Sequence, residues 1–163
     1  MTLVFFDMDD TLLAGDVEAA WANYMGENGL MKEEGFKEKI RKFDEDYRRG
    51  ELDFSVYTEF LLAPIKGMTV EEVQDIVKPF CVTIVEELKD TTTKGLLEKH
   101  SLDECLVTSG TLSFIVKEVA SLLGIETFFG TDPEVQEGCY TGKVSGKPNF
   151  GEEKVRKIEN WLG

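Results

Sequence analysis

Apolar and polar residues follow two different periods along this chain, and the change of period predicts where strands and helices lie. The chain opens with the run Leu3-Val4-Phe5-Phe6, whose residues favour extended structure and predict a short buried strand. From position 17 onward, apolar residues recur every three or four positions, as in amphipathic helices. Four such helices are expected, carried by Val17, Ala20, Trp21, Tyr24 and Met25; by Phe36, Ile40, Phe43 and Tyr47; by Phe54, Tyr57, Phe60 and Leu61; and by Val73, Ile76, Val77, Phe80, Ile84, Val85 and Leu88.

Capping residues mark where these helices begin. Asp16 and Asp53 stand at expected N-cap positions, where a side-chain oxygen accepts hydrogen bonds from the first turn. Thr69, with Glu72 three residues later, forms a capping box for the fourth helix. Pro79 lies inside that helix and predicts a kink or a split, because proline removes a helical hydrogen bond.

Strands return after the helical segment. A helix ending near His100 precedes an apolar strand that begins at residues 104–107 and is expected to end in the polar residues 108–111. A helix at 113–123, a strand at 125–129, a hairpin at 138–144 and a closing helix at 151–162 follow, the last with the apolar stripe Val155, Ile158, Trp161 and Leu162. Strand–helix–strand alternation at this spacing predicts a parallel sheet with right-handed crossovers.

The predicted fold class is therefore α/β, a Rossmann-like parallel sheet with an inserted all-helical segment. We expect residues 1–14 and 90–163 to form a discontinuous α/β core and residues 15–89 to form the helical insertion. A chain of 163 residues is long enough for one such core with a small insertion.

Charge and cysteine usage narrow the possible partners. Acids outnumber bases by 32 to 18, a net charge of -14, which repels nucleic acid and anionic membranes. No apolar run approaches membrane-spanning length, and no basic leader precedes the first strand. Cys81, Cys105 and Cys139 are far apart and His100 is the single histidine, which argues against a zinc site. We expect a cytoplasmic protein with no nucleic-acid or membrane partner.

Two carboxylates stand where the first strand ends. Asp7 and Asp9 would be costly in an apolar setting unless they paired or bound a metal, and open α/β sheets bind ligands at this edge. An acidic turn is one alternative. A calcium loop is another, because Asp7, Asp9, Thr11 and Glu18 have the right spacing, but Leu12 stands where such a loop needs glycine. A catalytic acid pair is the interpretation we favour.

The residues around this pair resemble a known family. Residues 5–12, Phe-Phe-Asp-Met-Asp-Asp-Thr-Leu, resemble the first motif, D-x-D-x-T, of the haloacid dehalogenase superfamily, whose members are mostly phosphatases. Residues 57–64, 131–134, 138–142, 146–150 and 153–155 resemble the phosphoserine-phosphatase-like branch in the same order. The resemblance implies a haloacid-dehalogenase-like core with a helical cap. It also implies a magnesium-dependent phosphomonoester hydrolase that acts through an aspartyl-phosphate on a small metabolite such as phosphoserine.

The resemblance also assigns roles to the acid pair. Asp7 becomes the nucleophile, and Asp9 becomes the acid and base that protonates the leaving oxygen and then accepts a proton from water. Two carboxylates this close repel each other, so one pKa should rise unless a cation is present. Mg²⁺ would answer that repulsion, held by the side chain of Asp7 and the main-chain carbonyl of Asp9.

Other positions match the phosphate-binding residues of the family. Thr108 and Ser109 fall at the place of the phosphate-holding hydroxyl and the amide after it, although a plain Ser/Thr turn would also explain them. Lys154 matches the lysine that balances the charge of nucleophile and phosphate, with Lys147 as a rival.

In the helical segment, the aromatic stripe is expected to be core. Trp21 and Tyr24 are nevertheless candidates for surface-facing substrate contacts, because the helix that carries them begins right after the acid loop.

One part of the family pattern is not found. No acidic pair resembling the fourth motif follows Lys154, and Asp132 lies in the wrong place in the order. We therefore expect a chain cut short by a few tens of residues, with its first strand at a sheet edge, weak magnesium binding and little activity. The alternatives are a non-catalytic phosphate- or metal-binding domain and a phospho-accepting receiver domain, which the helical insertion disfavours. The sequence carries no signal for the oligomeric state.

Overall fold

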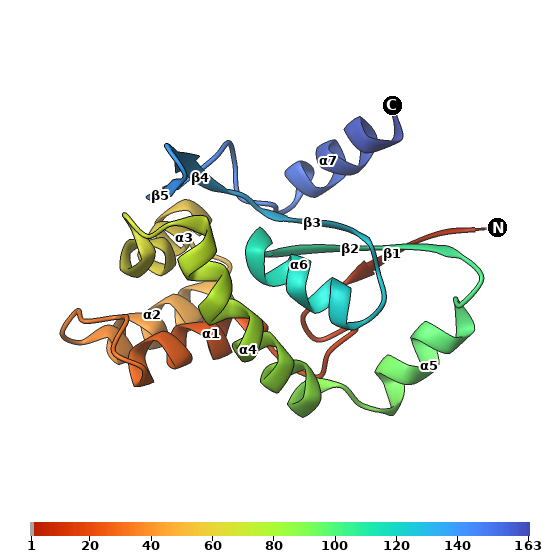
Figure 1. Ribbon diagram of the computed structural model, residues 1–163, viewed down its shortest axis with the longest axis horizontal. Coiled ribbons are helices and arrows are strands. Elements are labelled where there is room, and N and C mark those ends of the chain that lie inside the picture. Colours follow the sequence, from red (N-terminus) through yellow and green to blue (C-terminus); the bar gives the residue numbers. More distant parts are fainter. Residues whose placement is uncertain (1) are drawn as a thin grey trace.

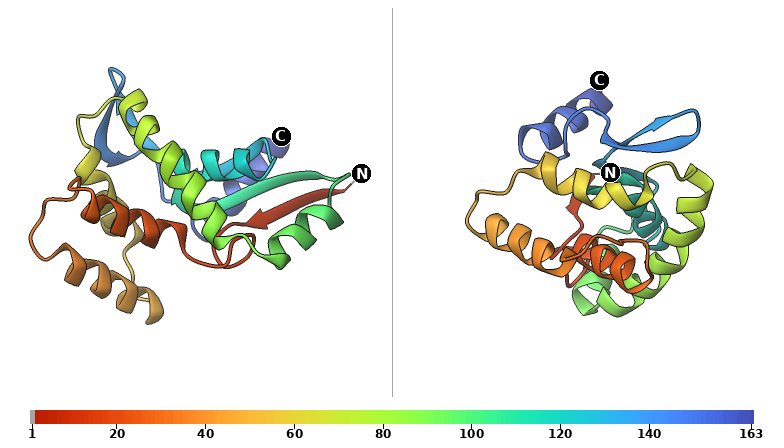
Figure 2. Two further views of the ribbon diagram at one scale, coloured as in Figure 1. Left: turned by 60° about the horizontal axis from the view of Figure 1, so that its bottom comes forward. Right: turned by 90° about the vertical axis from the view of Figure 1, so that its left-hand side faces the viewer.

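A computed structural model describes residues 2–163 and contains a three-stranded parallel sheet. The strands β1 (Leu3–Asp7), β2 (Glu104–Leu112) and β3 (Thr127–Thr131) lie in the order β1-β2-β3, so β1 is an edge strand, as expected (Figure 1). The β2-to-β3 crossover is α6 (Ser113–Leu122), and Figure 2 shows α6 and α5 (Thr91–Lys99) on opposite sides of the strands. The predicted α/β class is confirmed.

The second strand is longer than the sequence pattern predicts. Residues 108–111, where the strand is expected to end, belong to β2, which runs on to Leu112 with an irregularity in its pairing to β3. Ser109 and Thr111 look like turn residues because their side chains are polar. In the structure their hydroxyls lie against the carboxylate of Asp9, at 3.4 Å and 2.9 Å, so buried polar groups are satisfied without a turn.

The helical segment begins as the capping residues predict. Its helices are α1 (Val17–Glu27), α2 (Phe36–Arg48), α3 (Phe54–Leu62) and α4 (Val70–Leu88), with a short 3-10 turn, η1 (Ala63–Ile65), after α3. Asp16 accepts from the N–H of Ala19, Asp53 accepts from Ser55 and Val56, and Thr69 forms its capping box with Glu72. Of the kink or split expected at Pro79, the split is wrong, since α4 is one continuous helix, and the kink stays a prediction. None of the helices in the described residues has the length and apolar character needed to cross a membrane.

One hydrophobic core runs from the sheet into the helical segment. The ring of Trp21 in α1 packs edge-on against Phe80 of α4 and Phe114 of α6, at centroid distances of 5.2 Å and 6.1 Å. Helices α1 and α4 therefore belong to the same packed interior as α6. By contrast α2, which the structure describes completely, buries none of its residues. The division into a core and a cap of residues 15–89 stays a prediction.

The predicted hairpin is confirmed, but it forms its own sheet. Strands β4 (Pro133–Gln136) and β5 (Cys139–Val144) pair antiparallel, joined by Glu137 and Gly138, which both have positive φ as tight hairpin turns require. Main-chain hydrogen bonds attach this hairpin to the connection between α3 and α4. Tyr140 exchanges them with Gly67 and Met68, at 2.8 Å and 3.0 Å.

The last helix, α7 (Glu152–Leu162), packs less than its pattern predicts. Val155, Trp161 and Leu162 are 55%, 39% and 59% exposed, so much of the apolar stripe is not covered in this structure. Polar contacts attach the helix instead, chiefly through Lys157, whose Nζ donates to the carbonyl of Gly130 at 2.6 Å and pairs with Asp132 at 2.8 Å. A periodic pattern predicts a helix, but it does not predict that another element covers the apolar face.

The ring of Phe150 contacts both the sheet and the helical segment. Phe150 lies over Gly110 of β2 on one side and stacks on Phe54 of α3 on the other, with centroids 3.7 Å apart. A methyl group added to Gly110 would lie 2.1 Å from the Phe150 ring, so no larger residue fits there unless the ring moves.

This contact gives a first prediction. Gly110→Ala should lower the free energy of unfolding by about 1–3 kcal/mol, because the added methyl displaces the Phe150 ring. Gly95→Ala is the matched control: Gly95 lies in α5 with no atom near its missing side chain, so that variant should gain roughly 0.5–1 kcal/mol. Urea unfolding measures both. In a Phe150→Ala background the cost of Gly110→Ala should largely vanish, and an unchanged cost there would contradict this explanation.

Candidate active site

The parallel register places an acid and a hydroxyl side by side at one edge of the sheet. Asp7, the last residue of β1, pairs directly with Thr108 of β2. After Asp7 the chain turns back on itself, with Asp10 in the left-handed region at φ 57° and the N–H of Leu13 bonded to the carbonyl of Met8 at 3.1 Å. This tight loop carries Asp9 to the same edge, as the sequence predicts.

Asp9 is held by groups from two other parts of the chain, α1 and β2. Its Oδ1 accepts from the N–H of Val17 at 2.9 Å, and its Oδ2 accepts from the hydroxyls of Thr111 at 2.9 Å and Ser109 at 3.4 Å. Burial raises the pKa of Asp9 to about 6, with the nearby charges of Asp16 and Asp7 adding to the effect and the hydrogen bonds opposing it. The carboxyl can therefore both give and take a proton near neutral pH.

Asp7 has a different environment. Its side chain is 53% exposed, and its Oδ1 accepts from the N–H of Met8 at 3.0 Å and lies 3.4 Å from the Nζ of Lys154. Among the described residues, no hydrogen bond uses the other oxygen, Oδ2. A ligand can therefore reach this carboxylate beside a positive charge. The predicted proximity of Lys154 to Asp7 is thus confirmed, and Lys147 lies elsewhere, in a cleft.

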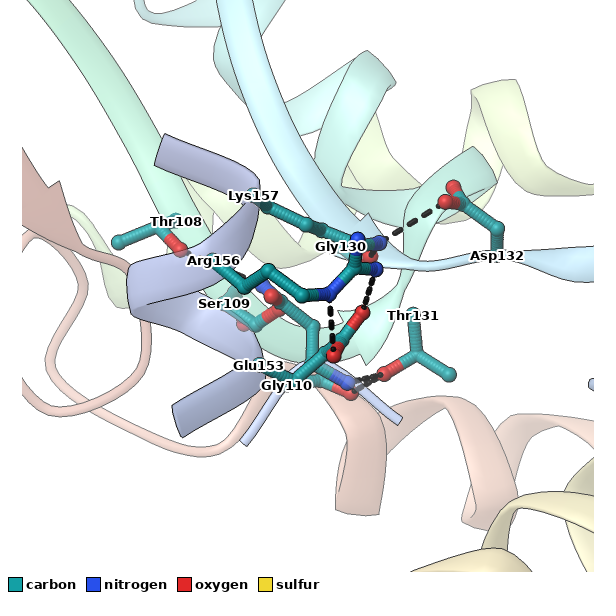
Figure 3. Close-up of polar contacts among 10 residues, drawn as sticks. Thr108, Ser109, Gly110, Gly130, Thr131, Asp132, Glu153, Arg156 and Lys157 are labelled. Atoms are coloured by element: carbon teal, nitrogen blue, oxygen red, sulfur yellow. Dashed lines mark hydrogen bonds and ion pairs between the residues drawn. The ribbon is translucent and has the colours of Figure 1, made fainter. Parts of the chain in front are cut away.

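Asn149 belongs to this site, and the sequence analysis missed it. Its side chain is fully buried, and its Nδ2 donates to the hydroxyl of Thr108 at 3.2 Å and to the carbonyl of Ser109 at 2.8 Å. Its main-chain N–H donates to Thr131, whose hydroxyl donates to the carbonyl of Gly110 (Figure 3). No local sequence signal marks an asparagine in a glycine- and proline-rich loop as buried.

The two serine and threonine candidates differ in what they offer a ligand. Thr108 is 8% exposed and stands beside Asp7, whereas Ser109 is 1% exposed with its hydroxyl between Asp9 and the N–H of Thr111. A phosphate-binding role for Ser109 stays a prediction that rests on its main-chain N–H, because its hydroxyl is already engaged.

The two aromatic candidates lie in the interior rather than at an open surface. Trp21 is fully buried, so its expected surface-facing position is wrong, and its ring stacks on that of half-buried Tyr24. Hydrophobic packing explains the position, since Trp21 also contacts Phe80 and Phe114. Substrate contact remains a prediction for Tyr24, the more exposed of the two.

Only a few oxygen atoms at this edge of the sheet could bind magnesium. Within residues 2–163, no group of three or more histidine, cysteine, aspartate or glutamate side chains could hold a metal ion. The free Oδ2 of Asp7 and the main-chain carbonyl of Asp9 remain, both hard oxygen donors. Mg²⁺ can bind through one or two carboxylates with phosphate and water completing its shell, so these groups fit that ion. Asp132 is engaged with Lys157 (Figure 3).

A cleft of about 800 Å³ opens between the start of α3 and the loop that leads into α7. It is lined by both charges and aromatic rings, including Lys147, Arg156, Asp53, Glu152, Phe54 and Phe150. Its lining residues Pro148 and Phe150 flank Asn149 in the loop, and its lining residue Glu153 precedes Lys154 in α7. The cleft is therefore formed by the immediate chain neighbours of the residues that contact Thr108 and Asp7.

A second buried carboxyl helps to join the helical segment to the sheet. Glu18 in the first turn of α1 is 6% exposed, and its Oε2 accepts from the N–H of Leu112 at 3.1 Å. Burial raises the pKa of Glu18 well above its usual range, and the charges of Asp16 and Asp9 raise it further. Together with the Asp9 contacts to Val17 and Thr111, this bond fixes the start of α1 against the end of β2.

Comparison with known proteins agrees with this arrangement. Residues 4–163 match a family model described as haloacid dehalogenase-like hydrolase. The chain is 32% identical over 163 residues to a histidinol-phosphatase of Neisseria meningitidis serogroup C, covering 98% of this chain and 73% of that protein. It is 28% identical over 162 residues to a phosphoserine phosphatase of Archaeoglobus fulgidus, covering 96% and 42%. A crystal structure of a protein of unknown function from Bordetella pertussis Tohama I superposes with a TM-score of 0.87 at 27% identity, covering 99% of this chain and 74% of that one.

The buried Glu18 gives the second prediction. Because its folded pKa is raised, the folded protein binds this proton more tightly than the unfolded chain does. That contribution is complete below the ordinary pKa of 4.5 and is lost as the pH rises through the folded value. Glu18→Gln keeps an acceptor for Leu112 but does not ionise. We expect the variant to melt at a higher temperature than the wild type at about pH 8, with the gain disappearing in acid.

Thermal melts across pH measure this difference. Glu126→Gln, at an exposed position, is the control and should show no such pH-dependent gain. A Glu18→Gln gain that stayed constant from acid to alkaline pH would show that the effect is packing and not ionisation.

Proposed function

The chain belongs to the haloacid dehalogenase-like hydrolases, a phosphatase assignment that its named relatives support, and we propose that it cleaves small phosphate monoesters through a phosphorylated Asp7. The observation that carries the proposal is the difference between its two neighbouring carboxyls. Asp7 is open to a ligand beside Lys154, whereas Asp9 is partly buried with a pKa of about 6. A nucleophile must be reachable by the substrate, and an acid–base group must exchange its proton near the working pH.

In the first step, a carboxylate oxygen of Asp7 attacks phosphorus as the bond from phosphorus to the ester oxygen breaks. Lys154 lowers the repulsion between the carboxylate and the incoming phosphoryl group, because its ammonium lies 3.4 Å from Asp7. The hydroxyl of Thr108 stands beside Asp7 in the register and can donate to a phosphoryl oxygen. The product of this step is an acyl phosphate on Asp7 and a free alcohol.

Asp9 completes both steps by moving one proton. In its neutral form it gives the proton to the departing ester oxygen, which avoids a free alkoxide. In the second step the ionised carboxylate accepts a proton from water as that water attacks phosphorus, releasing inorganic phosphate and restoring Asp7. The hydrogen bonds from Val17 and Thr111 hold the carboxyl in one position throughout.

Magnesium is part of the proposal. The side chain of Asp7 and the main-chain carbonyl of Asp9 would hold the ion, which when bound neutralises charge on the phosphoryl group.

For the substrate we propose a small phosphorylated metabolite with further charged groups, with phosphoserine and histidinol phosphate as the first compounds to compare. The support comes from the relatives' names and from the mixed charges of the cleft, where Lys147 and Arg156 face Asp53 and Glu152. We also propose that residues 15–89 act as the cap over this cleft, because α3 forms one of its walls.

The third prediction tests the roles of the two acids. Asp7→Asn should abolish turnover of both p-nitrophenyl phosphate and phosphoserine, because an amide cannot act as the nucleophile. Asp9→Asn should slow phosphoserine by roughly 10²–10⁴-fold but p-nitrophenyl phosphate much less, since the acidic phenol leaves without a proton donor. Steady-state kinetics with magnesium measures both.

Asp10→Asn, at an exposed acid of the same loop, is the control and should keep near-normal turnover. If Asp7→Asn retained turnover, or if Asp9→Asn slowed both substrates equally, the assigned roles would be wrong. A wild-type chain with magnesium that binds phosphate but turns over neither ester would favour a non-catalytic binding domain.

The fourth prediction separates the two candidate lysines. Lys154→Met should lower kcat/KM for p-nitrophenyl phosphate by about tenfold or more, because an ion pair next to the reacting carboxylate is lost. Lys147→Met removes a cation from the cleft wall. It should change kcat/KM for this small ester by less than about twofold, because an exposed charge contributes little. Equal losses in the two variants would count against Lys154 as the charge-balancing residue.

A further inference from the structure

Asn149 is buried more completely than its polarity alone would favour. A buried amide needs hydrogen-bond partners, and this one uses both its side-chain nitrogen and its main-chain N–H as donors. Its Oδ1, however, is buried with no partner among the described residues. A polar atom left without a partner is costly, so packing alone gives no reason for an asparagine here.

The neighbours of the amide fix which way it faces. The carbonyl oxygen of Ser109, 2.8 Å away, can only accept a hydrogen bond, so the amide group next to it must be the NH₂ and not the oxygen. The same NH₂ lies 3.2 Å from the hydroxyl oxygen of Thr108. Rotating the amide by half a turn would set two oxygens against each other at Ser109, so Asn149 is a donor to Thr108.

This contact determines where the Thr108 proton can lie. A hydroxyl has one proton and two acceptor positions. Because the Asn149 NH₂ occupies an acceptor position, the proton is turned away from the amide. Across residues 2–163, no hydrogen bond has the Thr108 hydroxyl as its donor, and the residue is paired in register with Asp7. The proton is thus available on a residue that adjoins the reacting carboxylate.

We propose that Asn149 is a positioning residue that orients the Thr108 hydroxyl to donate to the phosphoryl group at Asp7. This inference rests on the proposed function, because the proposed function supplies the phosphoryl ligand of the site. Asn149 does not touch the reacting atoms itself, and it acts through Thr108.

A separate contact holds Asn149 in place and provides a matched control. The main-chain N–H of Asn149 donates to Thr131 at 2.9 Å, and the Thr131 hydroxyl donates to the carbonyl of Gly110 at 2.7 Å (Figure 3). Thr131→Val would remove this support without changing any group that contacts Thr108. It therefore lowers stability near the site, whereas the Asn149 side chain keeps its own bonds to Thr108 and to the carbonyl of Ser109.

The fifth prediction uses this pair of variants. Asn149→Leu has a similar size and removes the NH₂ that donates to Thr108, without adding a charge near the phosphate. We expect the dissociation constant for inorganic phosphate to rise by about tenfold or more, because a hydrogen bond to a charged group is lost. Thr131→Val should stay within roughly twofold of the wild type, although it melts at a lower temperature. Titration calorimetry with phosphate and magnesium measures each constant.

A double variant tests whether Asn149 acts through Thr108. Thr108→Val removes the hydroxyl, and adding Asn149→Leu to it should weaken phosphate binding by no more than about twofold further, because the two positions are coupled. If Asn149→Leu does not fold, Asn149→Ala replaces it with the same expectation.

The outcomes separate this inference from the proposed function. Wild-type protein that does not bind phosphate would overturn both. Wild-type binding together with unchanged binding by the Asn149 variants, a loss as large in Thr131→Val, or a full additional loss in the double variant would overturn the inference alone.

Discussion

The buried carboxyl of Asp9 is the group on which the rest of the site depends. Removing a carboxylate from water is costly, and the surrounding chain meets that cost with a main-chain N–H from α1 and two hydroxyls from β2. These bonds join three segments that lie far apart in the sequence: the loop after β1, the first turn of α1 and the end of β2. The same carboxyl keeps a pKa of about 6 because its partners only partly offset its burial. Stability and reactivity thus follow from one constraint.

Local signals in the sequence predict much of this structure correctly. The strand at Leu3, the N-caps Asp16 and Asp53 and the capping box at Thr69 each depend on residues a few positions apart, and all form as predicted. The predicted burial of that strand is wrong, since Phe5 is 40% exposed at the sheet edge. Thr108, which pairs with Asp7, was a candidate through the family resemblance. The resemblance to a family added Lys154, which spacing could not have found, since it lies 147 residues from Asp7.

What the sequence could not predict depends on distant partners. The end of β2 looks like a turn until Asp9 is placed against Ser109 and Thr111. Asn149 has no local signature, because its role comes from contacts with β2 and β3. The buried indole of Trp21 agrees with the expectation that the aromatic stripe is core, and only its candidacy as a surface-facing substrate contact is wrong. The exposed stripe of α7 shows that periodicity alone does not predict which face is covered. The continuous core that Trp21 shares with α6 also means that α1 is packed with the sheet, while α2 is the least buried helix of the insertion.

The central claim is that Asp7 carries the phosphoryl group during turnover. The most direct measurement is to mix the chain with magnesium and p-nitrophenyl phosphate, stop the reaction in acid within its first turnover, and locate added phosphoryl groups by peptide mass spectrometry. The account predicts one phosphoryl group on the peptide that contains Asp7 and none in Asp7→Asn. Borohydride should reduce the acyl carbon of the phosphorylated Asp7 to an alcohol and release the phosphate. Turnover with no phosphorylated peptide, or with the group on Asp9 instead, would contradict it.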